Sequence, residues 1–331
     1  MPRSMPGAAD NPNRDPGEFE LIARYLVSRD EGKATGLVLG PGDDCALLSP
    51  SPGHQLAVSV DTSVVDVHFP AAAPAFAVGH RALAVALSDL AAMGARARWC
   101  IMALTIPRMD EAWVAAFSDG FHALCRESGV SLIGGDVTRG QLSVSVTVHG
   151  EVPPNRALRR SGGKAGDVLA VTGALGGGLG GLKAWQAGER DLEHELLKAY
   201  LLPRPRLAAG LVLRDLAHCA IDISDGLLAD LGHICRASGV GAELDPARLP
   251  LAAGLETALG HAAAQRAALT GGDDYELLFS MPSSVVDTAR QRLAAGGDTL
   301  TVIGRLKEAP GIAGVDAELV DGWQHFRGGA S

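Results

Sequence analysis

The sequence predicts an α/β (α+β) protein with mixed sheets, organised in two domains. Short β-prone runs alternate along the chain with segments of helical periodicity. The stretch 142–152 alternates apolar and polar residues almost throughout, which predicts a half-buried strand, and Pro153-Pro154 end it. Its 331 residues are enough for two domains. We expect a disordered, Pro- and Asn-rich tail over 1–16, an N-terminal domain over 17–152 and a C-terminal α/β domain over 153–331.

The N-terminal domain combines helices and strands. Apolar spacing predicts helices over 17–28, 74–94 and 110–128, and β-prone runs predict strands over 55–60, 98–106, 130–133 and 142–152. Pro74 suits the start of the second helix and Gly94 its end. That helix is very apolar apart from Ser88 and Asp89. A buried carboxylate is costly unless it is paired or bound to a metal, so Asp89 either has a partner or lies on an exposed face.

The C-terminal domain repeats this alternation. We expect strands over 167–171, 240–244, 275–280 and 300–305, and helices near 181–187, 193–201, 205–217, 226–237 and 283–295. Another β-prone run, from residue 220, leads through Asp222 and Asp225 to Gly226 and the helix after it. A strand that ends in carboxylates and turns into a helix places its acids at the edge of the sheet, where α/β proteins bind ligands.

Composition and charge restrict the class of function. The formal net charge of −9 argues against nucleic acid or an anionic membrane as the main partner, and it suits metal cations. Five cysteines are scattered without CxxC spacing, so neither a disulfide framework nor a zinc site is indicated. No run of about 18 apolar residues is present, and the first residues lack the apolar segment of a signal peptide. We therefore expect a cytoplasmic protein.

Six stretches place aspartates beside glycines or at strand ends. In chain order they are GPGDDCALL (40–48), SVDTSV (59–64), LSDLAAMGA (87–95), IGGDVTRG (133–140), AIDISDGLL (220–228) and GGDDYELLF (271–279). Each alone is weak evidence, because Asp and Gly are the ordinary residues of turns. Together they form a set of carboxylates with almost no neighbouring His or Cys, and oxygen-only ligands select a hard cation such as Mg²⁺.

Clustered Mg²⁺ indicates phosphate chemistry. The usual task of such ions is to bridge phosphate oxygens and neutralise charge while a phosphoryl group moves. Arg139, Arg159, Arg160 and Lys164 could supply cationic contacts to the same phosphates. ATP-dependent phosphoryl transfer is therefore the leading interpretation of the residues alone.

Other kinds of chemistry fit less well. The glycine loop 176–181 formally matches a dinucleotide fingerprint, but no second nucleotide-binding half is apparent, so a flexible loop or a helix entry is the alternative. No Walker A motif is present. Ser224 lies between two aspartates and outside any GxSxG motif, which favours a hydrogen-bond donor, and we expect no covalent nucleophile. His68 is either a substrate contact or a structural histidine at a strand end.

The six acidic motifs occur in an order and at a spacing that resemble the thiamine-monophosphate kinase family, over roughly residues 17–327. The resemblance implies the two-domain aminoimidazole-ribonucleotide-synthetase-like fold, whose N-terminal domains bind ATP and Mg²⁺ and pair into a dimeric barrel in a homodimer. It also implies the reaction of ATP with thiamine monophosphate to give ADP and thiamine diphosphate, by direct Mg-assisted phosphoryl transfer, in thiamine diphosphate biosynthesis.

The same resemblance assigns site residues. Several Mg²⁺ ions would be held, directly or through water, by Asp44, Ser59, Val60, Asp61, Asp89, Asp136, Asp222 and Asp225. ATP would lie against Gly135, Asp136, Arg160 and Ser224. The thiamine phosphate would lie against His68, Asp273 and Trp323. Trp323 suits this role because an aromatic face can stack on a cationic heterocycle.

Three residues depart from the family pattern. Val60 stands where relatives often carry threonine, so a metal contact there must come from its carbonyl group or from water. Ala86 replaces an asparagine that is common before the LSD motif, and Asp273 replaces a common glutamate, which shortens its reach toward the substrate. Two alternatives stay open: another ATP-using member of the same superfamily, and a non-catalytic nucleotide-binding protein of the same fold.

Overall fold

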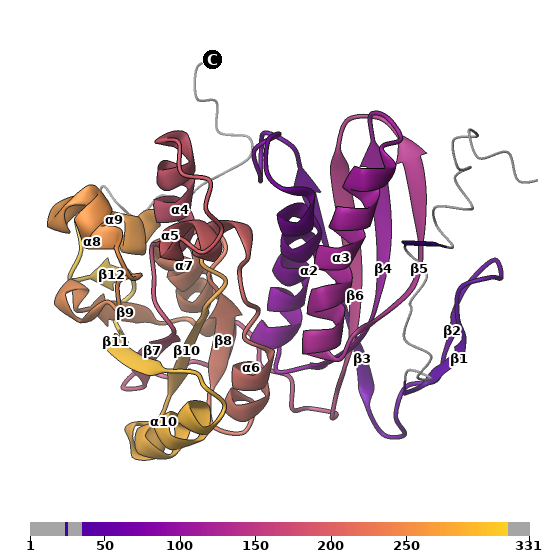
Figure 1. Ribbon diagram of the computed structural model, residues 1–331. Helices are drawn as coiled ribbons and strands as arrows, with labels where there is room; N and C mark the ends of the chain where they lie inside the picture. Colours follow the sequence, from indigo (N-terminus) through magenta and orange to yellow (C-terminus); the bar gives the residue numbers. More distant parts are fainter. Residues whose placement is uncertain (1–23, 26–34, 317–331) are drawn as a thin grey trace, which may run out of the picture.

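The computed structural model describes residues 24–25 and 35–316 (Figure 1). The tail over 1–16, most of the helix expected over 17–28, and Trp323 lie outside the described residues. The described part contains a four-stranded sheet in the order β3-β6-β4-β5 and a six-stranded sheet in the order β12-β9-β11-β7-β10-β8. Each sheet carries its own helices, so the chain forms two α/β units, and the expected mixed α/β class is confirmed.

The N-terminal unit is a mixed sheet with helices on one face. Its strands are β3 Gln55–Val64, β4 Arg96–Ile106, β5 Ser131–Arg139 and β6 Ser143–Val152. β4 and β5 are parallel, and the other pairs are antiparallel. The helices α2 Ala75–Ala92 and α3 Glu111–Ser128 cover one face (Figure 1). Among the described residues, the opposite face, which we call the open face, carries exposed apolar side chains such as Val58 and Val60.

Two strands of this sheet run further than the sequence indicated. β3 continues through Asp61 to Val64 because β6 pairs with it along its whole length. β5 continues past Ile133 through Gly135 and Asp136, since it pairs with β4 as far as Arg139. Gly135 permits this pairing, because a Cβ atom there would lie 2.0 Å from the carbonyl oxygen of Met102. The prediction that these strands end at their acidic residues was therefore wrong.

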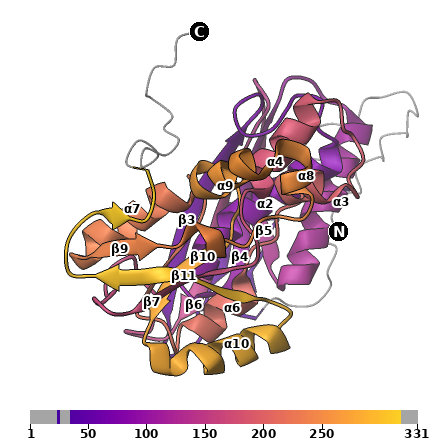
Figure 2. The same ribbon diagram turned by 90° about the vertical axis from the view of Figure 1, so that its left-hand side faces the viewer.

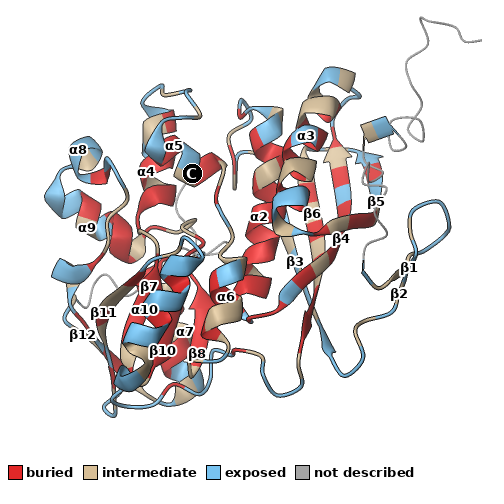
Figure 3. Cartoon of the chain, turned by 60° about the horizontal axis from the view of Figure 1, so that its bottom comes forward, coloured by how far each residue is buried: buried red, intermediate tan, exposed pale blue. Residues whose placement is uncertain are grey.

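Helix α2 lies between the two units (Figure 1). It contacts α3, β3 and β6 of the N-terminal unit, and α6 Leu207–Leu213 and β8 Cys219–Asp222 of the C-terminal unit. As predicted, Pro74 precedes its first residue, and Gly94, with a φ of 61°, follows its end. Its length and composition would allow it to cross a membrane, but 78% of the segment is buried inside the protein, which is typical of a core helix (Figure 3).

The C-terminal sheet is antiparallel except where β12 pairs with β9. Besides β8, its strands are β7 Val168–Thr172, β9 Gly241–Leu244, β10 Leu277–Met281, β11 Leu300–Lys307 and β12 Ile312–Ala313. Neighbouring residues of β7 face opposite sides, so Leu169 and Val171 belong to one core and Ala170 to another. Figure 2 shows α6 and α10 on one side of this sheet and α7, α8 and α9 on the other.

The helices of the C-terminal unit largely follow the predicted pattern. They are α4 Gly177–Gln186, α5 Glu195–Leu201, α6, α7 Leu227–Ser238, α8 Leu255–Leu259, α9 His261–Thr270 and α10 Val286–Ala295, with short 3₁₀ turns at Pro246–Arg248 and Ser283–Val285. Because α4 begins directly after Gly176, the glycine loop is a helix entry. Helices α8 and α9 were not predicted, nor were the short strands β1 Leu37–Leu39, β2 Leu47–Leu48 and β12.

Candidate active site

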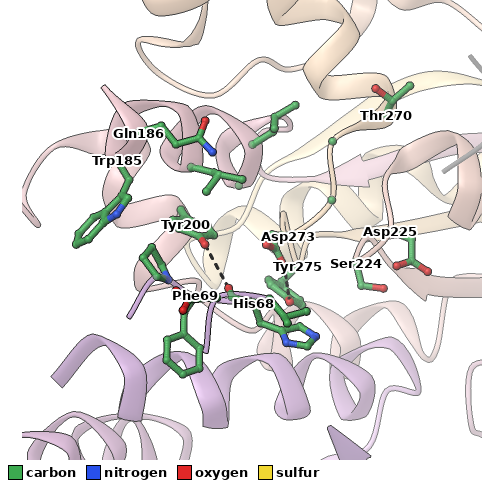
Figure 4. A pocket seen from close by; sticks show the side chains of 18 of the residues that line it. His68, Phe69, Trp185, Gln186, Tyr200, Ser224, Asp225, Thr270, Asp273 and Tyr275 are labelled. Carbon is green, nitrogen blue, oxygen red and sulfur yellow. Dashed lines mark hydrogen bonds between the residues drawn. The ribbon is translucent and has the colours of Figure 1, made fainter. Parts of the chain in front are cut away.

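A cleft of about 630 Å³ lies between the two units. It is bounded by the loop after β3, by α4 and the end of α5, and by the loops that follow β8 and α9. Figure 4 shows that its two ends differ in chemistry: Trp185 and Tyr200 lie at one end, Ser224 and Asp225 lie at the other, and Asp273 lies between them. The cleft is therefore suited to a ligand with a ring system at one end and a polar group at the other.

Near the acidic end, α2 joins the two units through two consecutive residues. Asp89 Oδ2 accepts a hydrogen bond of 2.5 Å from Ser59 Oγ on β3. Ser88 Oγ donates a hydrogen bond of 2.7 Å to Asp222 Oδ2 at the end of β8. Consecutive residues of a helix point about 100° apart, so one turn of α2 reaches both sheets. Asp89 is half-buried and has the partner that the sequence analysis required.

The charge of Asp89 repels two other carboxylates, those of Asp61 and Asp222. Burial and the charge of Asp89 raise the pKa of Asp222 to about 6. Burial and Asp89 likewise raise the pKa of Asp61, on β3. A hard cation bound between such carboxylates would offset this repulsion, and carboxylate oxygens are its preferred ligands. The residue types therefore fit Mg²⁺. Within residues 24–25 and 35–316, however, no three His, Cys, Asp or Glu side chains are already gathered closely enough to hold an ion.

The loop after β8 is held by a residue that the sequence analysis missed. Asp230, on α7, accepts hydrogen bonds of 3.1 Å at Oδ2 from the backbone N–H groups of both Ser224 and Asp225. Burial, together with the charges of Asp222 and Asp225, raises the pKa of Asp230 to about 8. The available signal was its position in the first turn of α7, where acids commonly accept hydrogen bonds from free backbone N–H groups.

Asp273 and Tyr275 lie in a turn with left-handed backbone. Their φ angles are 68° and 52°, which are uncommon for residues other than glycine and often mark functional sites. The Asp273 N–H donates to the carbonyl oxygen of Ser224 at 2.9 Å, and the Tyr275 N–H donates to that of Ile223 at 2.8 Å. The expected substrate contact Asp273 therefore lies directly beside the expected ATP contact Ser224.

His68 makes a structural contact and also lines the cleft. Its Nδ1 accepts a hydrogen bond of 3.0 Å from the Val64 N–H, which is a structural contact. Its ring also lines the cleft, and its carbonyl oxygen accepts a hydrogen bond of 3.3 Å from the Tyr200 hydroxyl group (Figure 4). Tyr200 and Trp185 were not anticipated, because their places on short helices gave no sign that they face a cleft.

The remaining expected residues lie outside this cleft. Asp44 is exposed on the β1–β2 hairpin, which extends away from the C-terminal unit (Figures 1 and 3). Arg160 is exposed, but its positive charge partly offsets the rise in the pKa of Asp222. Arg160 therefore lies near the acidic end. Gly135 is exposed on β5, where its backbone pairs with Met102 of β4.

Asp136 and Val60 lie on the open face. One row of paired residues crosses the sheet from strand to strand. It runs from Asp136 on β5 through Ala103 on β4 and Ser145 on β6 to Thr62 on β3. Residues paired in this way point to the same side, and Thr62 and Asp136 are both exposed. Val60 is 61% exposed on the same face, whereas Ser59 and Asp61 alternate with it toward α2. Of the predicted metal ligands, Asp61 and Asp225 thus line the cleft, and Val60 and Asp136 lie on the open face. Ser59, Asp89 and Asp222 lie near the acidic end of the cleft, and Asp44 lies on the hairpin.

Comparison with known proteins identifies similar chains. Residues 42–152 match the model of the AIR synthase related protein N-terminal domain, and residues 164–316 match that of the C-terminal domain. The thiamine-monophosphate kinase of Escherichia coli (strain K12) is 45% identical over 325 residues, which cover 94% of this chain and 98% of that protein.

Two solved structures are similar over most of the chain. The thiamine-monophosphate kinase from Stenotrophomonas maltophilia K279a matches with a TM-score of 0.81 and 44% identity, covering 89% of this chain and 94% of that one. AaThiL complexed with AMPPCP and TMP matches with a TM-score of 0.75 and 30% identity, covering 94% of this chain and 97% of that one.

Proposed function

The chain belongs to the thiamine-monophosphate kinase family, and on this premise we propose that it transfers the γ-phosphate of ATP to thiamine monophosphate. The products are ADP and thiamine diphosphate, which places the reaction in thiamine diphosphate biosynthesis. The observation that carries the proposal is that a single cleft has an aromatic end and a carboxylate-lined end. Such a cleft can hold the rings of thiamine monophosphate while its phosphate lies at the acidic end.

We infer that Mg²⁺ is the cofactor at the acidic end, with more than one ion bound. The residues that would hold it are Asp61 and Asp225, which line the cleft, together with Asp89, Asp222 and Ser59 near its acidic end. When bound, Mg²⁺ supplies neutralisation of phosphate charge and bridges between phosphate oxygens. The repulsion of Asp61 and of Asp222 by Asp89 supports this assignment, because a bound cation offsets it.

Ser224 is the candidate for contact with the nucleotide. Its hydroxyl group is exposed at the acidic end and has no hydrogen-bond partner within the described part of the chain. Its backbone N–H and carbonyl groups are already engaged by Asp230 and Asp273, so the backbone that carries the hydroxyl group is fixed. Arg160 lies near Asp222 and can neutralise phosphate oxygens.

The acceptor occupies the rest of the cleft. Tyr200 and Trp185 provide apolar walls for a heterocycle, and His68 and Asp273 provide polar contacts. Trp323, which lies outside the described residues, is a further candidate for stacking on the rings. Since no activated nucleophile lies in the cleft among the described residues, the phosphoryl group passes directly between the two substrates.

We also propose that the protein is a cytoplasmic homodimer that pairs through the open face, with residues 17–152 as the ATP- and Mg-binding domain. The support comes from Leu56, Val58 and Val60, which are 44%, 56% and 61% exposed on the open face. Exposed apolar residues in a row mark an interface more often than a surface in water. Pairing there would also cover Asp136 and bring a second chain close to it.

The experiment that tests the function is a coupled assay of ADP release. Thiamine monophosphate is compared as acceptor with thiamine and with no acceptor, in the presence of Mg²⁺ and ATP. We expect ADP release that depends on thiamine monophosphate and yields thiamine diphosphate in equal amount. ATP binding without acceptor-dependent release would instead favour a non-catalytic nucleotide-binding protein, and no response to this acceptor would favour another activity of the superfamily.

A further inference from the structure

Arg81 is a fully buried cation beside the cleft that neither the motifs nor the proposed reaction uses. It lies on α2, and its side chain is 1% exposed. Its Nη1 donates a hydrogen bond of 2.6 Å to the carbonyl oxygen of Tyr200, and its Nη2 lies 2.7 Å from Asp273 Oδ1. The guanidinium carbon lies 5.0 Å from the ring centre of Tyr200 and 5.7 Å from that of Tyr275. Arg81 therefore contacts three residues that line the cleft.

Burial of this charge requires an explanation. Removing a guanidinium group from water is unfavourable unless it is paired and hydrogen-bonded, and an apolar residue in its place often gives an equally stable core. Its Nε, moreover, has no hydrogen-bond partner within the described part of the chain. Stability alone is thus a poor reason for a cation at this position of α2.

Arg81 fixes one of the two oxygens of Asp273. Asp273 Oδ1 lies 2.7 Å from Arg81 Nη2 and accepts a hydrogen bond of 2.8 Å from the Tyr275 hydroxyl group. Oδ2 has no partner among the described residues, and the Asp273 side chain is 33% exposed in the wall of the cleft. Two donors on Oδ1 hold the carboxyl group in one orientation, so Oδ2 is presented to a ligand as a hydrogen-bond acceptor.

The same turn is tied to the acidic end of the cleft. The backbone bonds from Asp273 to Ser224 and from Tyr275 to Ile223 prevent the turn from moving independently of the loop that carries Asp225. Gly272 packs closely against this loop, because a Cβ atom there would lie 2.4 Å from the carbonyl oxygen of Ser224. Arg81 thus reaches from the N-terminal unit and orients a carboxylate at a fixed distance from the phosphate-binding end.

We propose that Arg81 is a positioning residue for the phosphate acceptor. By holding Asp273 Oδ1 together with Tyr275, it directs Oδ2 toward an N–H donor on the heterocycle of the acceptor, such as an exocyclic amino group. This proposal rests on the proposed function for the identity of the acceptor. Arg81 thus affects the binding and alignment of the acceptor and has little effect on the binding of the nucleotide.

The test compares Arg81→Met with the wild type by calorimetric titration of thiamine monophosphate and, separately, of a non-hydrolysable ATP analogue with Mg²⁺. Hydrogen bonds to charged groups correspond to roughly 10- to 100-fold in affinity, so we expect thiamine monophosphate to bind at least about tenfold more weakly. We expect the affinity for the ATP analogue to change by less than about threefold. In steady-state assays, KM for thiamine monophosphate should rise more than KM for ATP.

Arg214→Met is the matched control. Arg214 also links the units, since its Nη1 donates a hydrogen bond of 2.9 Å to the carbonyl oxygen of Gly94, but it does not line the cleft. If Arg81 only braces the two units, both variants will lower the melting temperature and both affinities alike, and that result overturns the proposal. Unchanged binding of thiamine monophosphate to Arg81→Met also overturns it. If the wild type itself neither binds nor phosphorylates thiamine monophosphate, the proposed function fails instead.

Two further variants keep the test decisive. Arg81→Lys retains a cation for Asp273 but loses the second donor, so its affinity for the acceptor should fall between those of Arg81→Met and the wild type. Tyr275→Phe removes only the other hydrogen bond to Oδ1 and should weaken acceptor binding even if Arg81→Met does not fold. The double variant with Arg81→Met and Asp273→Asn should bind thiamine monophosphate only slightly more weakly than either single variant, because both changes act through one contact. Additive losses would contradict the proposal.

Discussion

Ser88 Oγ and Asp222 Oδ2 form a buried hydrogen bond of 2.7 Å that joins α2 of the N-terminal unit to β8 of the C-terminal unit. The bond favours the ionised form of Asp222, but burial and the charge of Asp89 outweigh it and raise the pKa of Asp222 to about 6. This carboxylate is therefore incompletely stabilised where the two units meet, and a cation is the partner that fits it.

Mg²⁺ should stabilise the protein at about pH 7.5 and have little effect at about pH 5. The folded-state pKa of Asp222 is raised from 3.8 to about 6, so in the absence of metal its protonation stabilises the fold below about pH 4, and this contribution is lost as the pH rises through about 6. Above that pH the carboxylate is ionised and can bind the ion. Melting temperatures with and without Mg²⁺ at the two pH values check this, and an equal increase at both would contradict it.

Asp222→Asn should remove most turnover without destabilising the metal-free fold. The amide keeps an acceptor for Ser88 but cannot share charge with a cation, and loss of one electrostatic contact of this kind typically lowers kcat by roughly 100-fold or more. The repulsion from Asp89 also disappears, so the melting temperature should stay the same or rise. The coupled ADP assay and a thermal melt measure both effects. Near-normal kcat would exclude a role for Asp222 in phosphoryl transfer.

The motifs that carry acids at element ends could be predicted from the sequence. A β-prone run followed by Asp222, Asp225 and Gly226 indicated a strand, a ligand loop and a helix, and the structure has β8 and α7 there. Asp89 was anticipated to need a partner because it interrupts an apolar helix. Which residue it meets, Ser59, depends on how α2 packs on β3, and residue spacing along one chain does not contain that information.

The contributions of Arg81 and Tyr200 could not be predicted for a different reason. Their roles arise from contacts between residues far apart in the sequence, such as the ion pair of Arg81 with Asp273. In the sequence, Arg81 is an ordinary polar position near the start of a long helix. The position of Asp136 was equally hidden, because its face depends on the strand register, and a strand end had been predicted at that point.

His80 should make the protein less stable in acid. Its Nε2 lies 2.9 Å from the carbonyl oxygen of Pro203, and burial lowers its pKa from 6.5. A depressed histidine pKa gives a contribution to stability that is present above about pH 6.5 and is lost as the pH falls through the folded-state value. We expect the free energy of unfolding, measured in urea, to differ less between about pH 7.5 and about pH 5 for His80→Gln than for the wild type. His54→Gln, at an exposed site, serves as the control and should leave the difference unchanged.

Val58→Asp should separate the proposed dimer. A charge in the middle of β3 on the open face has to be desolvated when two such faces meet, whereas in a single chain Val58 is 56% exposed and the position tolerates aspartate. Sedimentation velocity should show a dimer for the wild type and a monomer for the variant at the same concentration. Met93→Asp changes an exposed apolar residue at the end of α2 and should remain dimeric. A monomeric wild type would contradict the proposed pairing.

Gly120→Ala should destabilise the N-terminal unit although alanine is the better helix former. A Cβ atom on Gly120 of α3 would lie 1.9 Å from the carbonyl oxygen of Phe76, and one on Gly79 of α2 would lie 2.1 Å from that of Phe117. The two helices thus approach each other through their glycines, and an added methyl group has to push their backbones apart. Overpacking of this kind costs about 1–3 kcal/mol.

Gly232→Ala in α7 is the matched control for this change. It meets only the flexible end of the Arg236 side chain, so the gain in helix propensity, up to about 1 kcal/mol, should appear without a clash. Chemical denaturation of the two variants should therefore give shifts in the free energy of unfolding of opposite sign. Since α2 also carries Ser88 and Asp89, a displaced α2 should weaken Mg²⁺ binding in Gly120→Ala and leave it unchanged in Gly232→Ala. Equal Mg²⁺ affinities would show that the helix contact stabilises the fold without setting the geometry of the acidic end.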